Sequence, residues 1–142
     1  MAKEKTLRRH PHAREKMGTF TVLLGIGSPD RQSFREVEAL VDTGATFTCV
    51  PEDLLRELGH LPLGSERFEM ADGRIVEREL TEAPVRIDGK TRTTTCIFGD
   101  EGSTALLGTV TLEQFLLAPD PVHQELVSVR GLAMMAGRVK TD

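Results

Sequence analysis

Apolar and polar residues alternate in short runs from Thr19 onward, and turn-forming residues separate these runs. A two-residue period is typical of half-buried strands, so the pattern predicts a β-rich domain. We expect the first strand at 19–26, before a Gly-Ser-Pro-Asp turn, and the second at 34–41, where the sequence becomes steadily more apolar. A last strand is expected at 125–130.

Two Asp-Gly pairs mark expected hairpins in the middle of the chain. They are Asp72-Gly73 and Asp88-Gly89, each flanked by strand-like sequence. Asp-Gly suits the positive φ angles of two-residue hairpin turns. The sequence therefore predicts two hairpins between the second strand and the C-terminal third of the chain.

Two short helices are expected among the strands. The segment 51–59 begins with a proline, has acids in its first turn and ends at a glycine, which is the usual order of helix signals. Its inward residues should be Leu54, Leu55 and Leu58. A second helix is predicted at 111–117, where Thr111 and Gln114 are spaced for a capping box and two prolines follow. The fold class is therefore all-β with two short helices.

The length of 142 residues suits one domain, and the charge is unevenly spread. Six basic and two acidic residues give 1–16 a charge of +4. Because the net charge of the whole chain is −4, residues 17–142 carry −8. We expect a basic N-terminal tail at 1–16, one domain at 17–131 and a C-terminal tail at 132–142. The basic N-terminal tail is either solvated or in contact with a polyanion or acidic partner. For the acidic body, which lacks Trp and Tyr, nucleic acid is an unlikely ligand.

Composition also bears on location and metal binding. The sequence has neither an apolar run long enough to span a membrane nor the apolar core of a signal peptide, so a cytoplasmic protein is expected. Cys49 and Cys96 lack the spacing of a zinc site and should be reduced, buried residues. His10 and His12 alone make a poor metal site, and no metal is expected.

The residues that suggest chemistry lie at the end of the second expected strand. The apolar run Ala39-Leu40-Val41 leads into Asp42-Thr43-Gly44-Ala45-Thr46. Such a strand end would hold a carboxylate at the floor of a cleft, and the glycine would let backbone amides approach it. The triplet alone is weak evidence, because it also occurs in ordinary turns. A second feature, Leu106-Leu107-Gly108, strengthens it: an apolar, tightly turned segment that precedes a helix.

With these elements in this order, residues 19–130 resemble the retropepsin-like aspartic peptidases, the retroviral protease clan, in the form of a bacterial-type single-domain member. The segment 42–45 resembles the catalytic loop, and 106–108 resembles the hydrophobic-hydrophobic-glycine element that packs beside it. Residues 109–117 resemble the helix that follows. The segment 70–74 lies where the family has its substrate-covering flap, although its charged tip departs from the glycine-rich retroviral pattern.

The resemblance implies a half-barrel that works as a two-fold homodimer, with no cofactor. It implies catalytic roles for Asp42, Thr43 and Gly44. The expected substrate-binding residues come from the catalytic loop, the flap and the hydrophobic element: Ala45, Thr46, Met70, Ala71, Asp72, Gly73, Arg74 and Leu107.

A single Asp-Thr-Gly leaves the expected site incomplete. Aspartic peptidases activate water between two carboxylates that share one proton. No other aspartate of the chain precedes a similar pair of residues, so each copy of a homodimer should supply one Asp42. The expected partners are a second copy and a protein or peptide substrate that binds as an added strand. The dimer interface is expected at 125–130, with Leu132, Met134 and Met135.

Other interpretations stay open at this point. The same fold could serve as a peptide-binding or dimerisation module with little or no cleavage, or Asp42 could merely satisfy a turn in an unrelated β domain. Cys49, just after the catalytic loop, is either a redox control or a packing residue. His60 and His123 are expected on surface turns.

Overall fold

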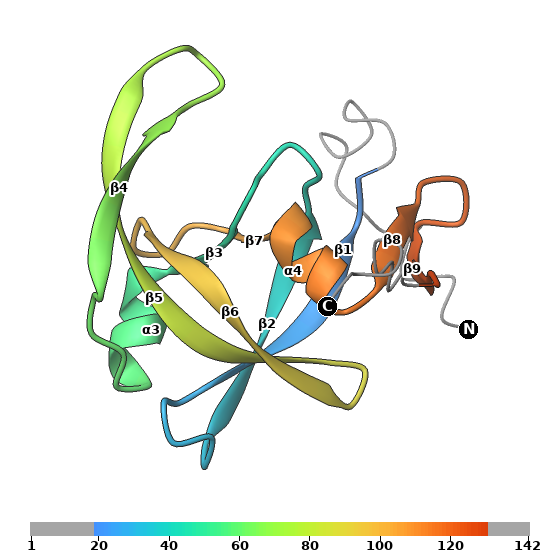
Figure 1. Cartoon of the computed structure of the whole chain (residues 1–142), viewed down its shortest axis with the longest axis horizontal. Coiled ribbons are helices and arrows are strands. Elements are labelled where there is room, and N and C mark those ends of the chain that lie inside the picture. Colours follow the sequence, from blue (N-terminus) through green and yellow to red (C-terminus); the bar gives the residue numbers. More distant parts are fainter. Residues whose placement is uncertain (1–18, 131–142) are drawn as a thin grey trace, which may run out of the picture.

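In the computed structural model, residues 19–130 are described, and they form a β-barrel with two short helices (Figure 1). The strands and helices within this range are β1 (Thr21–Gly27), β2 (Phe34–Val41), β3 (Thr48–Pro51), α3 (Glu52–Glu57), β4 (Gly64–Glu69), β5 (Ile75–Ile87), β6 (Lys90–Gly99), β7 (Ala105–Leu107), α4 (Thr109–Gln114), β8 (Leu117–Asp120) and β9 (Glu125–Ser128). The all-β fold with two short helices predicted from the sequence is confirmed. The expected tails at 1–16 and 132–142 lie outside the described residues.

The main sheet has the strand order β1-β2-β7-β3-β6-β5-β4. It closes into a barrel because β1 also pairs with β5, through Gly25 with Arg86 and Ile26 with Val85. Most neighbours are antiparallel, but β2 with β7 and β3 with β6 are parallel. The parallel β2–β7 pair brings the end of β2 next to the end of β7, where the candidate site lies.

The core is the inside of the barrel, lined by the inward positions of its strands. Leu24 and Ile26 on β1, Val50 on β3, Val85 on β5 and Leu107 on β7 are all fully buried. Alternate positions on a strand face opposite sides of a sheet, so the alternation seen in the sequence predicts this arrangement. The helix α3 covers one end of the barrel with Leu54 and Leu55, and α4 packs Leu112 and its neighbour Phe115 against the core.

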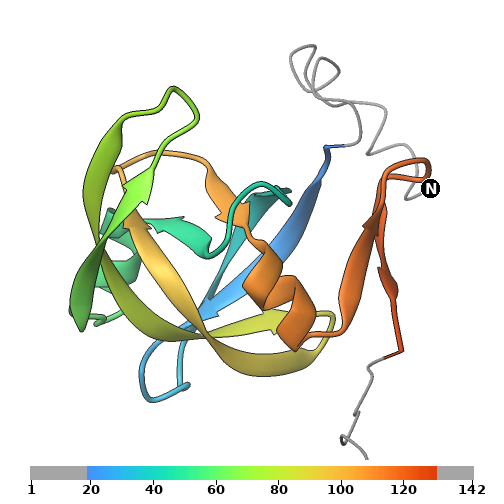
Figure 2. The ribbon, with the colours of Figure 1, turned by 45° about the horizontal axis from the view of Figure 1, so that its top comes forward.

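The hairpin β4–β5 projects from the barrel beyond the other strands (Figures 1 and 2). Its turn lies at Met70–Arg74, with Gly73 at a φ of 88°. The second hairpin, β5–β6, turns at Asp88 and Gly89, both at positive φ as the Asp-Gly signal requires. Both predicted hairpins are therefore confirmed.

The second helix is not where the sequence predicts it. The helix α4 covers Thr109–Gln114, with Gly108 at its N-cap and no side-chain cap, so the Thr111–Gln114 capping box is wrong. Thr111 lies inside the helix, and its hydroxyl is used for buried contacts instead. Leu117 begins β8, a strand that includes Pro119 and that the sequence analysis missed.

The strands β8 and β9 form a separate two-stranded sheet, which Figure 2 shows beside the barrel. Leu117 and Leu126 pack against the barrel core, and Val129 N donates to Leu116 O at 2.9 Å. The last strand ends at Ser128 rather than at 130. Among residues 19–130, β8 and β9 pair only with each other, so each has an open outer edge.

His60 is not on the surface as predicted. It follows α3, but its side chain is buried, and its Nε2 lies 2.7 Å from the carbonyl oxygen of Gly27. This hydrogen bond ties the end of α3 to the turn after β1. His123, in contrast, lies on the exposed β8–β9 turn as predicted. No helix in the described part of the chain is long and apolar enough to cross a membrane.

Candidate active site

Asp42 follows β2 directly, and its backbone is fixed by β7. Val41 is paired with Leu107 in the parallel register, and the amide of Asp42 donates to the carbonyl oxygen of Leu107 at 3.0 Å. The expected packing of the 106–108 element beside the loop is therefore present. The strand pairing ends at Asp42, so the chain turns there and leaves the carboxylate half-buried at the barrel rim.

The loop folds back onto the carboxylate. The amide of Gly44 donates to Oδ1 of Asp42 at 2.9 Å, and the amide of Ala45 donates to its carbonyl oxygen at 3.1 Å. A Cβ at Gly44 would lie 3.2 Å from the same carboxylate oxygen, which is closer than ordinary contact. Thr43 is exposed, and its hydroxyl has no hydrogen bond within residues 19–130. The Thr43 hydroxyl is therefore available to a group outside this part of the chain.

The far side of the loop lies against Gly108 and the start of α4. The amides of Thr109 and Val110 donate to the carbonyl oxygens of Ala45 and Thr46, at 2.9 and 3.0 Å. A Cβ at Gly108 would lie 2.6 Å from the backbone carbon of Phe47. A glycine is thus required here because the loop backbone crosses directly over it.

Three buried threonines support this crossing, and sequence reasoning missed them. Oγ1 of Thr111 lies 2.7 Å from that of Thr48 and 2.9 Å from that of Thr94. Oγ1 of Thr48 also accepts from the amide of Gly108 at 3.1 Å. All three side chains are buried. Threonine is common in strands, so nothing in the sequence separates this network from ordinary strand residues.

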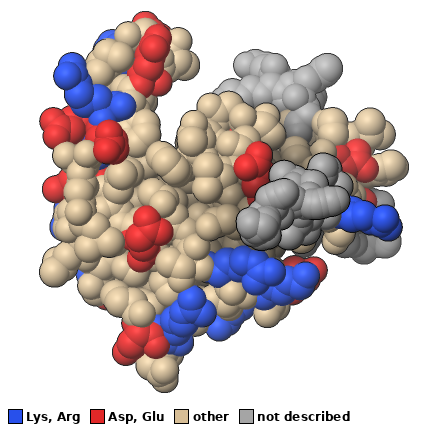
Figure 3. Space-filling view, in the orientation of Figure 1, with Lys and Arg blue, Asp and Glu red and all other residues tan. Residues whose placement is uncertain are grey.

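The β4–β5 hairpin, called the flap below, lies on the same side of the barrel as the 42–46 loop (Figure 1). Figure 3 shows a notch between this projecting hairpin and the rest of the molecule. The flap tip is a tight turn in which Met70 N donates to Arg74 O at 2.7 Å and Gly73 N donates to Met70 O at 2.9 Å. The candidate cleft is therefore open to solvent between the loop and the flap.

The two charges at the flap tip neutralise each other. Nε of Arg74 donates to Oδ2 of Asp72 at 2.8 Å, and the amide of Arg74 donates to Oδ1 at 3.1 Å. These two hydrogen bonds hold the pKa of the Asp72 carboxyl below its usual range. The charged tip, which departs from the glycine-rich family pattern, thus adds little net charge to the cleft.

The predicted site residues fall into two groups and one exception. Asp42 to Thr46 lie together in the loop, and Met70 to Arg74 lie together at the flap tip. The prediction that Leu107 contacts substrate is wrong, because its side chain is fully buried in the barrel core. Leu107 contributes to the site through its carbonyl oxygen, which accepts a hydrogen bond from the Asp42 amide. The alternate residue Leu106 points to the other face and is half-buried.

The two cysteines have different surroundings. Cys96 is fully buried, and burial raises the pKa of its thiol to about 12. Cys49, on the strand that follows the loop, is partly exposed, and burial also raises its pKa. Both thiols are free. A raised pKa lowers the thiolate fraction, which disfavours a redox role for Cys49 and fits packing.

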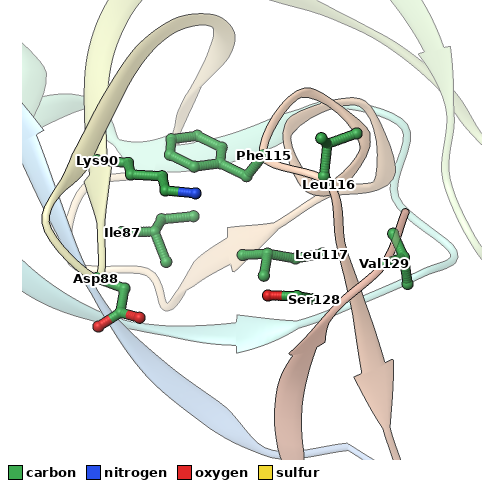
Figure 4. Close-up of a pocket in the computed structure, with 8 residues that line it drawn as sticks. All are labelled: Ile87, Asp88, Lys90, Phe115, Leu116, Leu117, Ser128 and Val129. Carbon is green, nitrogen blue, oxygen red and sulfur yellow. The ribbon is translucent and has the colours of Figure 1, made fainter. Parts of the chain in front are cut away.

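Two pockets in the described part of the chain lie away from Asp42. One of about 160 Å³ lies between β5, β6, the end of α4 and the β8–β9 sheet (Figure 4). In Figure 4, Ile87 and Leu117 point into it below Phe115 and Lys90. A second, larger pocket opens between β1, β5 and the same sheet. Neither pocket includes a residue of the loop or the flap tip. Both lie where the β8–β9 sheet packs against the barrel.

One group of metal-ligating side chains occurs at the tip of the β8–β9 hairpin. Asp120, His123 and Glu125 each place a ligand atom within 4.8 Å of the others. The Asp120 carboxylate already accepts bonds from Nδ1 of His123 at 2.7 Å and from two backbone amides. The His123 hydrogen bond is the main cause that lowers the pKa of Asp120. These hydrogen bonds are those of a turn, and they explain why the side chains lie close together.

Comparisons with known proteins agree with this geometry. A family described as "gag-polyprotein putative aspartyl protease" matches residues 33–114, which is more than half of the chain. No curated protein sequence is a match. The matched range includes the 42–46 loop, the flap and the helix α4.

Among solved structures, the fold is similar to viral proteases. The EIAV protease complexed with the inhibitor HBY-793 has a TM-score of 0.54 and 18% identity, over 67% of this chain and 86% of that one. The simian foamy virus protease has a TM-score of 0.50 and 18% identity, over 71% of this chain and 100% of that one. The foamy viral protease-reverse transcriptase in complex with an RNA/DNA hybrid has 0.51 and 16%, over 71% of this chain and only 12% of that one. At these identities the similarity is one of fold. The chain therefore belongs to the gag-polyprotein aspartyl protease family and has the retropepsin-like fold.

Proposed function

We propose that this protein is an aspartic endopeptidase and that one chain carries half of its active site. The observation that supports this most directly is the setting of Asp42. The carboxylate lies at a barrel rim, accepts the Gly44 amide at 2.9 Å, and has its own amide fixed to Leu107. A carboxylate held so firmly beside an open cleft is suited to positioning a water molecule.

The proposed chemistry requires two such carboxylates. Two carboxyl groups about 3 Å apart cannot both ionise easily, so one holds a proton while the other acts as the base that activates water. The protonated group then donates to the peptide carbonyl as the water attacks it. Because this chain has one Asp-Thr-Gly, a two-fold homodimer would place one Asp42 from each copy at the axis. The chemistry needs neither a metal nor a cofactor.

Other residues of the loop and the flap would hold the substrate. The Thr43 hydroxyl, exposed and without a partner in residues 19–130, is available to bond across the axis. Ala45, Thr46 and the flap tip at 70–74 flank the cleft, where an extended peptide would bind as an added strand. The closing flap would exclude water from the reacting groups.

The β8–β9 sheet is the proposed dimer contact. Its outer edges are open within the described residues, and open strand edges pair readily with other strands. Val127 and Val129, on and just after β9, are exposed apolar residues. A second copy of the sheet would cover both the edges and these side chains. Leu132, Met134 and Met135, which lie outside the described residues, are proposed to extend this interface.

The test is to replace the carboxylate by its amide. Asp42→Asn should fold and dimerise like the parent but fail to cleave an unfolded protein such as casein between mildly acidic and neutral pH. Asp88→Asn is the matched control, since Asn tolerates the positive φ of that distant turn. Equal cleavage by parent and Asp42→Asn would refute the proposal. Cleavage by neither would favour a peptide-binding module with the same fold.

A mixing experiment tests the half-site separately. If chains exchange between dimers, the inactive variant should inhibit the parent, because a mixed dimer has only one Asp42 carboxylate. A tenfold excess of Asp42→Asn should reduce the activity of the parent to about a tenth. The same excess of Asp88→Asn should not. If Asp42→Asn has no effect after exchange is demonstrated by mass, the site does not need two copies.

Free Cys49 and Cys96 are consistent with a reducing compartment, and we propose a cytoplasmic location. The proposal predicts that the protein keeps both thiols when it is isolated without added oxidant.

A further inference from the structure

We propose that Phe47 and Phe68 form an aromatic latch that fixes the position of the flap relative to the 42–46 loop. Their ring centroids lie 6.2 Å apart with an interplanar angle of 89°, an edge-to-face contact. Phe47 follows the 42–46 loop directly, and Phe68 is on β4 of the flap. The contact therefore joins the floor of the candidate cleft to its cover.

Phe47 is held in place from below. Its backbone crosses Gly108 so closely that a Cβ there would lie 2.6 Å from its carbonyl carbon. The next residue, Thr48, is fully buried and bonded to Thr111. A ring carried by so firmly packed a backbone is a fixed point, so the movable member of the pair is Phe68.

Phe68 lies on the inner face of the flap. It is paired with Val76, and both are half-buried, whereas the next pair toward the tip, Glu69 with Ile75, is exposed. Because alternate residues of a strand face opposite sides, this difference separates an inner face from an outer one. The Phe68 ring therefore points toward the loop and not into solvent.

Among the hydrogen bonds, ion pairs and ring contacts of the described residues, the latch is the outermost one between flap and barrel. In the described residues, the hydrogen bonds and ion pairs of 69–75 are all within the hairpin itself. Arg78, two residues nearer the barrel than Val76, pairs with Asp100 at 2.8 Å. That ion pair is largely exposed on the Asp100 side, and such pairs contribute little and are screened by salt. The aromatic contact is thus the one that holds the outer flap.

The first test measures flap opening directly and does not depend on activity. Amide hydrogen exchange at 66–76 should become about two- to tenfold faster in Phe68→Ala and in Phe47→Ala, as expected for the loss of an edge-to-face pair. The double variant should add little to either single change, since both remove the same contact. Phe68→Tyr, which keeps the ring, should restore slow exchange.

Phe34→Ala is the matched control. Phe34 is also a half-buried phenylalanine, but its ring packs beneath Arg86 and near Gly27, away from the flap. It should leave exchange at 66–76 unchanged. Slow exchange of the core strands reports that each variant is folded. If Phe68→Ala does not fold, Phe68→Leu takes its place in the experiment. Unchanged flap exchange in folded Phe47 and Phe68 variants, or full additivity of the two, would overturn the latch.

The link to catalysis rests on the proposed function. With a peptide substrate, Phe68→Ala should lower kcat/KM about two- to tenfold, mainly through KM, and Phe68→Tyr should recover it. If the parent cuts no peptide while the exchange result holds, the proposed function fails and the latch stands. If the parent cuts peptides but the flap exchanges equally in all variants, the latch fails and the peptidase stands.

Discussion

The amide nitrogen of Asp42 donates a hydrogen bond to the carbonyl oxygen of Leu107, 3.0 Å away. Leu107 ends β7, and Asp42 directly follows β2, a strand far from β7 in the sequence but its parallel neighbour in the barrel. The position of the candidate catalytic carboxylate therefore depends on a segment that contains no catalytic side chain. Changes around Leu107 should act on the 42–46 loop as strongly as changes in the loop itself.

Gly108→Ala should damage both stability and the loop. The added Cβ would meet backbone atoms of Phe47 at 2.6 and 2.7 Å and of Ala45 at 2.9 Å, and backbone cannot move aside as a flexible side chain can. We expect a loss of about 3 kcal/mol in the free energy of unfolding, as for other overpacked sites. Urea unfolding measures this loss.

Gly64→Ala provides the control for this prediction. Its Cβ would have no atom within 4 Å, and Gly64 has no positive φ that only glycine tolerates. We expect a change of less than about 0.5 kcal/mol at this exposed position. Equal stabilities of the two variants would contradict the close crossing at Gly108.

Thr111→Val should weaken the support beneath the loop. The side chain keeps its shape but loses the hydroxyl that bonds Thr48 and Thr94, which leaves buried polar groups without that partner. The expected cost is about 1 to 3 kcal/mol in the free energy of unfolding. Thr111→Ser keeps the hydroxyl and should retain more of this network. A valine variant as stable as the parent would show that the network contributes nothing.

Cys96 should make the protein lose stability at alkaline pH. Burial raises the pKa of its thiol to about 12, whereas an unfolded cysteine ionises near pH 8.5. Since only the unfolded chain releases the proton between these values, this contribution is fully present below about pH 8.5 and is lost as the pH rises toward 12. The expected slope is up to about 1.4 kcal/mol per pH unit.

Urea unfolding at several pH values under reducing conditions measures this slope. The chain has no tyrosine to titrate in the same range. Cys96→Ala should flatten the dependence, while Cys49→Ala should leave most of it, because Cys49 is less buried. The same alkaline slope in the parent and Cys96→Ala would contradict this assignment.

The sequence predicts the elements that rest on local rules. The strand at Phe34–Val41 has the predicted bounds, and the turns at Asp72-Gly73 and Asp88-Gly89 are where the Asp-Gly pairs indicate. The helix at Glu52–Glu57 lies inside the predicted range, although Pro51 ends β3 as well as capping the helix. Such features depend on a few neighbouring residues, which a single sequence contains.

Features that depend on distant residues were missed or misplaced. Thr111 is spaced for a helix cap, but its buried contacts with Thr48 and Thr94 decide its place inside α4. Leu107 and Leu106 cannot be assigned to core and rim until β7 is placed between β2 and β3. His60 follows a surface helix and has the polarity of a surface residue, yet the Gly27 carbonyl gives it a buried partner.

The crossing of the 42–46 loop over Gly108 also has a consequence for synthesis. Asp42 leaves the ribosome well before β7, Gly108 and Thr111, which together fix the backbone around it. A nascent or truncated polypeptide that ends before β7 carries the acid but not the groups that orient it. The order of translation therefore delays the formation of the candidate site until nearly the whole barrel has been made.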